Sequence, residues 1–69
     1  MKGTVILTEQ QHRALGLFIE GLSIQEIALS LGVSYQRALT VLNSILLKTE
    51  FKNRRELLAN AKSLEIVVK

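Results

Sequence analysis

The 69-residue sequence contains no cysteine, no proline and no tryptophan, and aromatic residues make up only 4% of it. Without cysteine, neither a disulfide nor a thiolate zinc site can stabilise the fold. The single histidine, His12, belongs to no cluster of metal ligands, and no nucleophile, phosphate loop or metal-ligand spacing is present. We therefore expect no enzyme activity, no metal and no cofactor.

The sequence also lacks a long apolar run. None approaches the ~18 residues that a membrane span needs, and the apolar part of the N-terminus is too short for a secretory signal. We therefore expect a cytoplasmic protein with no membrane contact. A net charge of +3 suits a polyanionic partner, but many domains that bind no nucleic acid carry as much.

Hydrophobic residues make up 48% of the chain, which is too many for a disordered segment. The length allows one small domain, spanning 1–69, with a core over 7–61 and arms at 1–6 and 63–69. Met1 and the absence of a linker favour a complete chain. The arms contain short β-branched runs that could pair with each other, pair with a second subunit, or fray.

Three capping boxes predict where helices begin. Each places Ser, Thr or Asn three residues before Glu or Gln and ahead of an apolar-periodic run: Thr8–Gln11, Ser23–Glu26 and Asn53–Glu56. A further helix is expected to begin after Ser34 and to run to about Glu50. The fold class is therefore all-α, with four helices around one core and short extended arms at the two ends.

The turn Leu31–Ser34 joins the second and third predicted helices. Gly32 can adopt the left-handed conformation that ends a helix, and Ser34 can cap the next one. A short helix, a glycine-bearing turn and a longer helix form the helix-turn-helix pattern, in which the second helix enters the major groove of DNA.

An ordered series of motifs extends this pattern over residues 7–61. Without gaps, it resembles the DNA-binding domain of the LuxR/GerE class. The helix-turn-helix of sigma-factor region 4 is the nearest rival, but Arg54-Arg55-Glu56-Leu57 favours the LuxR side. The residues that carry the resemblance are Leu7-Thr8-Glu9, Gly21-Leu22-Ser23, Glu26-Ile27-Ala28, Leu31-Gly32-Val33-Ser34, Ile45-Leu46, Lys48 and Arg54-x-Glu56-Leu57.

The resemblance implies a bacterial or phage transcription regulator with a four-helix fold. Its third helix would read bases in duplex DNA. Its fourth helix would form a homodimer, and here that interface would be Leu57, Leu58 and Ala61.

The sequence departs from the family at several positions. At some of them the family's usual residue is cationic. The family usually has lysine at Leu39 and Gln25, often histidine at Val41, and arginine or lysine at Leu47. It also usually has threonine at Arg37 and glutamate at Gln11. Because cationic groups that could read guanine are absent, we expect a preference for A·T-rich sites.

Successive side chains on the third predicted helix are separated by about 100° around the helix axis. This places Gln36, Thr40, Asn43 and Leu47 opposite Ala38, Ile45 and Thr49. The amides of Gln36 and Asn43 match the donor and acceptor of adenine, while Thr40 and Leu39 could contact thymine. The predicted base-reading residues are Gln36, Leu39, Thr40 and Asn43. The alternative is that the polar residues are simply solvated.

Five cations are predicted to contact phosphates, which fixes the register of a protein on DNA but not the sequence read. They are Arg37, Lys48, Lys52, Arg54 and Arg55. A different interpretation also remains open. If Leu39 and Leu47 form an apolar contact surface, this helix binds a transcription factor or RNA polymerase and does not bind DNA specifically.

Overall fold

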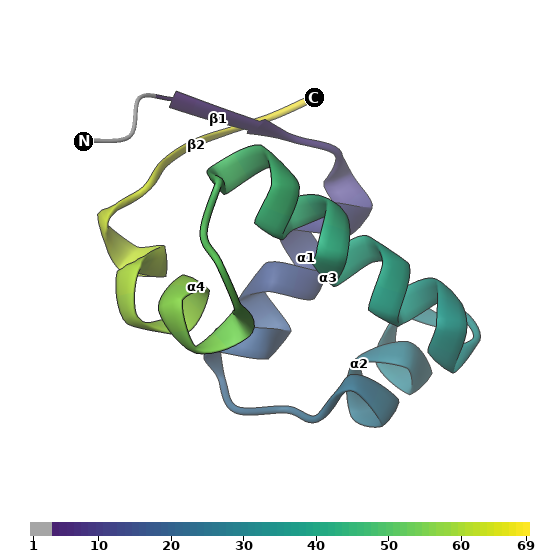
Figure 1. Ribbon diagram of the computed structural model, residues 1–69. Coiled ribbons are helices and arrows are strands. Elements are labelled where there is room, and N and C mark those ends of the chain that lie inside the picture. The colour runs from purple at the N-terminus through teal and green to yellow at the C-terminus, as the bar shows by residue number, and fades with distance from the viewer. Residues whose placement is uncertain (1–3) are drawn as a thin grey trace.

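The computed structural model describes residues 4–69, which fold into four α-helices and two short strands (Figure 1). The predicted helical body is therefore present, with strands at both ends. Residues 1–3 of the predicted N-terminal arm lie outside the described residues. The elements are β1 (Thr4–Leu7), α1 (Glu9–Ile19), α2 (Ile24–Leu31), α3 (Tyr35–Thr49), α4 (Arg54–Asn60), the short 3-10 helix η1 (Ala61–Ser63) and β2 (Glu65–Val68).

Two of the three predicted capping boxes are confirmed. The Thr8 and Ser23 side chains each accept a hydrogen bond from the backbone N–H three residues on. The side-chain oxygens of Gln11 and Glu26 in turn accept from the backbone N–H groups of Thr8 and Ser23. The third box is only half formed. Asn53 caps the Glu56 N–H, but the Glu56 carboxylate accepts from the Lys52 N–H at 2.7 Å. The prediction was wrong here because the Glu56 carboxylate accepts from the Lys52 N–H and not from the Asn53 N–H. Asn53, with φ −155°, also has a more extended backbone than Thr8 and Ser23.

The turn between α2 and α3 is the predicted one. Gly32 has φ +71°, and its N–H donates to the Leu29 carbonyl while the Val33 N–H donates to the Ala28 carbonyl. These are the two bonds of a Schellman motif. The Ser34 hydroxyl then accepts from the Arg37 N–H at 3.1 Å and starts α3.

One face of α3 forms the centre of the core, where it packs against α1 and α2 (Figure 1). Ala38, Val41, Leu42 and Ile45 are buried as predicted, whereas Leu46 is only partly buried. Thr49 is the one buried polar residue among residues 4–69, and its hydroxyl donates to the Ile45 carbonyl. This face therefore contains no unsatisfied polar group.

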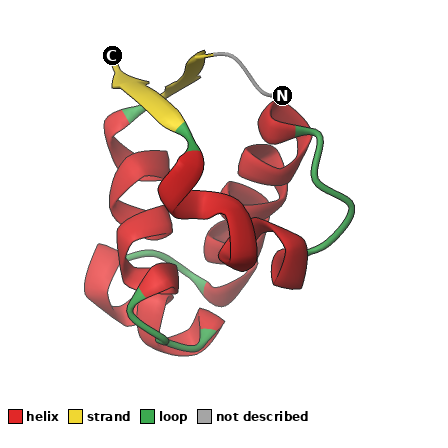
Figure 2. Ribbon diagram, turned by 90° about the vertical axis from the view of Figure 1, so that its left-hand side faces the viewer, coloured by secondary structure: helices red, strands yellow, loops and turns green. Residues whose placement is uncertain are grey.

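The two strands pair with each other in parallel at one end of the helical body (Figure 2). In the register, Val5 is opposite Ile66 and Leu7 is opposite Val68. Val5 and Leu7 are buried, so the core begins within the predicted N-terminal arm. A pure four-helix description is therefore incomplete, because β1 and β2 pair with each other beside the helices.

The predicted dimer interface on α4 needs correction. Leu57 and Ala61 point into the protein's own core and are buried, because α4 and η1 pack this side inward. Only Leu58 is exposed, at 47%. Leu57 and Ala61 are therefore not available to a second subunit, and a dimer interface on α4 stays a prediction that depends on Leu58 alone among the three residues.

Within residues 4–69, no helix combines the length and the apolar character that a membrane span requires.

Candidate nucleic-acid interface

The outer face of α3 is a polar stripe, defined here as Gln36, Thr40, Asn43 and Leu47. All four side chains are exposed, and they lie opposite the buried face of the same helix. The predicted orientation of α3 is therefore confirmed. No segment of the described chain covers this stripe.

The polar groups of the stripe differ in what they can offer to a ligand. Within residues 4–69, no hydrogen-bond partner holds the side-chain amides of Gln36 or Asn43, so both can pair with an external donor and acceptor. The Thr40 hydroxyl donates to the Gln36 carbonyl at 2.9 Å. Thr40 therefore presents its methyl group and an acceptor oxygen to a ligand, but not a hydroxyl donor.

Leu39 does not lie on the stripe as an exposed leucine. It is partly buried, because its position on α3 lies between the core face and the solvent face. Leu47, by contrast, is 80% exposed. Of the two leucines predicted to be exposed, only Leu47 is available in full for contact with a partner.

A small groove flanks the stripe where the start of α1 meets α3. It is lined by residues that include Thr8, Gln10, Arg37 and Thr40. The Arg37 guanidinium donates to the Gln10 side-chain oxygen at 3.1 Å, and an arginine has further N–H donors beyond this one. This side of α3 therefore places a cation next to Thr40.

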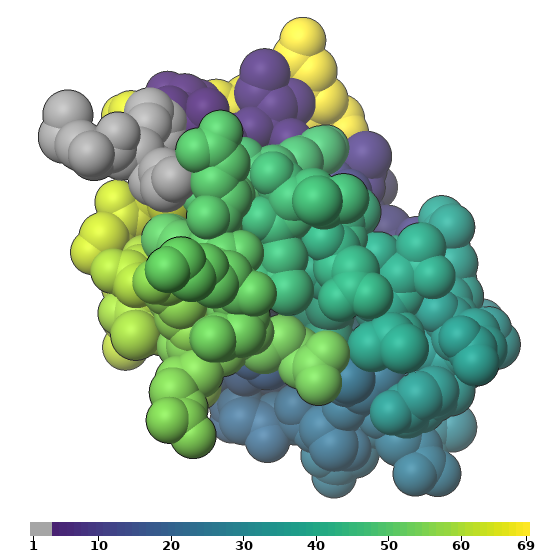
Figure 3. All heavy atoms as spheres, viewed as in Figure 1, coloured from purple at the N-terminus to yellow at the C-terminus, as the bar shows by residue number. Residues whose placement is uncertain are grey.

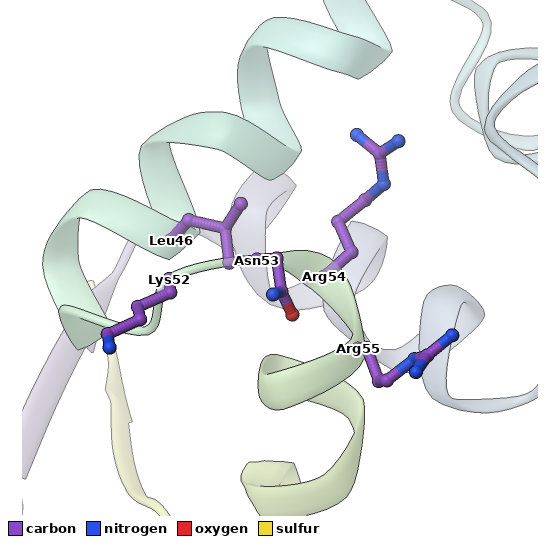
Figure 4. Close-up of a pocket in the computed structure, with 5 residues that line it drawn as sticks. All are labelled: Leu46, Lys52, Asn53, Arg54 and Arg55. Carbon is purple, nitrogen blue, oxygen red and sulfur yellow. The ribbon is translucent and has the colours of Figure 1, made fainter.

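The other flank is the cationic cluster, defined as Lys52, Arg54 and Arg55 around the start of α4 (Figure 4). Lys52 and Arg55 point in opposite directions, with Arg54 between them. All three are exposed, and their charged groups have no hydrogen-bond or ion-pair partner within residues 4–69.

The cationic cluster is continuous with the polar stripe. One depression is lined by Leu46, Lys52 and the two arginines. A second depression is also lined by Leu46 and Lys52, and it extends to Asn43 and Leu47. The stripe is therefore bordered by positive charge at both flanks, with Arg37 on one side and the cationic cluster on the other.

Lys48 occupies a different environment from the other predicted phosphate ligands. Its ammonium group donates to the Ile6 carbonyl at 3.0 Å and to the Gln11 side-chain oxygen at 2.9 Å. The same Gln11 oxygen accepts from the Thr8 N–H at the start of α1. The Gln11 side-chain N–H donates to the Ser44 hydroxyl at 2.7 Å. Lys48 thus ties β1 and α1 to α3, a contact that no local sequence pattern indicates.

No family model, curated protein or solved structure matches this chain. Among the described residues, no group of three or more His, Cys, Asp or Glu side chains is placed to hold a metal ion. The candidate interface therefore rests on the geometry of α3 and its two flanks.

The contacts of Lys48 predict a role in stability. Lys48→Met keeps the aliphatic stem but removes the ammonium, so we expect the free energy of unfolding to fall by about 1 kcal/mol. Lys52→Met is the matched control, because the Lys52 ammonium has no partner in the described chain, and its effect should stay within about 0.5 kcal/mol. Urea unfolding of both variants measures the difference. Equal stabilities would show that the Lys48 contacts do not stabilise the fold.

Proposed function

We propose that this chain is a small transcription regulator of the LuxR/GerE type that binds duplex DNA by placing α3 in the major groove. The observation that carries the proposal is the polar stripe. It presents two unpaired amides on the solvent side of a helix whose other side is fixed in the core. The glycine-capped turn before α3 and the ordered motifs of the sequence support the same assignment.

The size of the stripe suits base reading. A rise of 1.5 Å per residue puts Gln36 and Asn43 roughly 10 Å apart along the axis of α3, which is about three base-pair steps. The major groove is wide enough to admit a helix. Each copy of α3 would therefore read a subsite of a few base pairs.

The chemistry of the stripe favours adenine over guanine. A carboxamide can donate to and accept from the exposed edge of adenine at the same time, while the commonest guanine contact uses arginine or lysine. The polar stripe contains amides, a threonine and a leucine, but no cation. The methyl group of Thr40 and the side chain of Leu47 can contact the methyl group of thymine.

The flanking cations would contact the phosphate backbone on either side of the groove. Arg37 and the cationic cluster are the best candidates, because their donors are wholly or largely available. Lys48 is a weaker candidate, since two of its three N–H donors are already used within the fold. Backbone contacts of this kind would set the register of α3 without selecting a sequence.

Fluorescence anisotropy with labelled duplex DNA across a salt series tests this proposal. We expect binding at low salt that weakens as salt rises, and Arg54→Ala should lower the salt slope by about 1. Lys62→Ala is the matched control, because this exposed cation lies on η1, away from the polar stripe, and should leave the slope unchanged. A chain that binds no duplex even at low ionic strength would contradict the proposal.

A second function is favoured by the exposure of Leu47. This side chain adjoins a depression that Leu46 and Phe51 also line, which makes the C-terminal half of α3 partly apolar. Such a surface fits a helix-turn-helix module that binds a transcription factor or RNA polymerase and does not bind DNA specifically.

Leu47→Lys distinguishes the two functions. If α3 binds DNA, the added cation should leave the affinity for duplex DNA unchanged or raise it, and should increase the salt slope by up to about 1. If α3 binds protein, the substitution should abolish capture of RNA polymerase by the immobilised chain. Leu58→Lys, which changes an exposed leucine on α4, controls for the added charge.

A further inference from the structure

Strand β2 has one edge without a partner in the described chain. Within residues 4–69, the sheet contains only β1 and β2. In a parallel pair, alternate residues direct both backbone groups at the neighbouring strand. Leu7 is opposite Val68 and accepts a hydrogen bond from the Lys69 N–H at 2.9 Å, so Glu65, Val67 and Lys69 face β1. Ile66 and Val68 therefore direct their N–H and C=O groups away from it.

The outer edge of β2 is also apolar and accessible. Val67 and Val68 are 42% and 44% exposed, and the C-terminal residues project beyond β1 in the space-filling view (Figure 3). The outer edge of β1 differs, because the Lys48 ammonium donates to the Ile6 carbonyl there. Natural proteins usually cover or blunt an apolar strand edge, since it can pair with another strand. Here a lysine covers the outer edge of β1, whereas no such contact covers the outer edge of β2 within residues 4–69.

The sequence of β2 and the residue after it is complementary to its own reverse. If two copies align antiparallel with Val67 opposite Val67, Glu65 of each copy lies opposite Lys69 of the other. Two pairs of opposite charge then flank an apolar centre. The segment is Glu65-Ile66-Val67-Val68-Lys69.

The same alignment also satisfies the backbone. In an antiparallel pair, residues directly opposite each other exchange both hydrogen bonds at every second position. Ile66 and Val68 have their groups on the outer edge, and they lie opposite each other in this register. The two copies would therefore form four backbone hydrogen bonds, which use the outward N–H and C=O groups of Ile66 and Val68 in each copy.

We propose that a second copy of this chain binds the outer edge of β2, giving a twofold dimer with one four-stranded sheet in the order β1–β2–β2–β1. A two-stranded ribbon is marginal alone, and a four-stranded sheet packed on helices is more stable. On its outer face, Ile6, which is 50% exposed, lies beside Val67. The dimer goes beyond the proposed DNA binding and does not depend on it.

Charge variants in the absence of DNA test the dimer. Sedimentation equilibrium of the wild-type chain up to about 1 mM should show a reversible dimer, as a small interface predicts. Glu65→Lys or Lys69→Glu places like charges opposite each other at two positions, so each should raise the dimer Kd by about tenfold. An equimolar mixture of the two variants should recover dimerisation as a heterodimer, because its opposed charges are again complementary.

Matched controls separate register from net charge. Glu20→Lys and Lys62→Glu make the same charge changes at exposed positions outside β2, and should leave the Kd unchanged. A wild-type chain that stays monomeric over the whole concentration range would overturn the proposal. So would a dimer that resists both strand variants, or one that only Leu58→Glu disrupts, since the last would place the interface on α4.

A backbone variant provides an independent arm. Val68→Pro removes an N–H that points away from β1, so the protein's own ladder should persist while one intermolecular bond per copy is lost. We expect the dimer Kd to rise about tenfold or more, with an unchanged far-ultraviolet circular dichroism spectrum. A folded variant with wild-type affinity would contradict pairing at this edge.

Discussion

Burial of the inner face of α3 is the constraint on which the candidate interface depends. Ala38, Leu42 and Ile45 are fully enclosed, and α1 and α2 pack against this side of the helix. Because successive side chains turn by about 100°, fixing these three residues also fixes which residues meet solvent. A rotation of α3 by one residue would expose part of the core and bury an amide, so the outward position of Gln36 and Asn43 follows from packing alone.

Polar contacts support that packing from the N-terminal side. The Thr8–Gln11 capping box would normally serve only α1, but Gln11 also bonds Ser44 and accepts from Lys48 on α3. Lys48 extends the connection to β1 through the Ile6 carbonyl. One glutamine and one lysine thereby hold three elements together. As a result, a cation next to the proposed DNA surface is largely occupied within the fold.

Features set by local spacing could be predicted from the sequence. The caps at Thr8 and Ser23, the turn at Gly32 and the two faces of α3 depend on residues only a few positions apart. The parallel pairing of β1 with β2 could not be chosen among its alternatives, because its two segments are about sixty residues apart and neither has a turn signal linking them. Contacts across the fold explain the other differences.

Those differences concern how exposed single residues are. The apolar spacing on α4 identified Leu57 and Ala61 correctly as one face, but could not say whether the core or a second subunit covers it. Leu39 was considered together with Leu47 as an apolar contact surface, yet it is partly buried. Lys48 was predicted to contact phosphate, but its ammonium donates to Gln11 on α1 and to Ile6 on β1. For Leu57, Ala61 and Lys48, the neighbours that decide the outcome lie on other elements.

The most direct test is a nuclear magnetic resonance titration of the isotope-labelled protein with an A·T-rich duplex, following the side-chain amide signals. Base reading by α3 predicts that the signals of Gln36 and Asn43 shift on binding, and shift less with a G·C-rich duplex of equal length. The amide of Asn60, which lies at the end of α4, should change little. If the duplex binds and the Gln36 and Asn43 signals stay in place, or if no signal moves at low ionic strength, α3 does not read DNA.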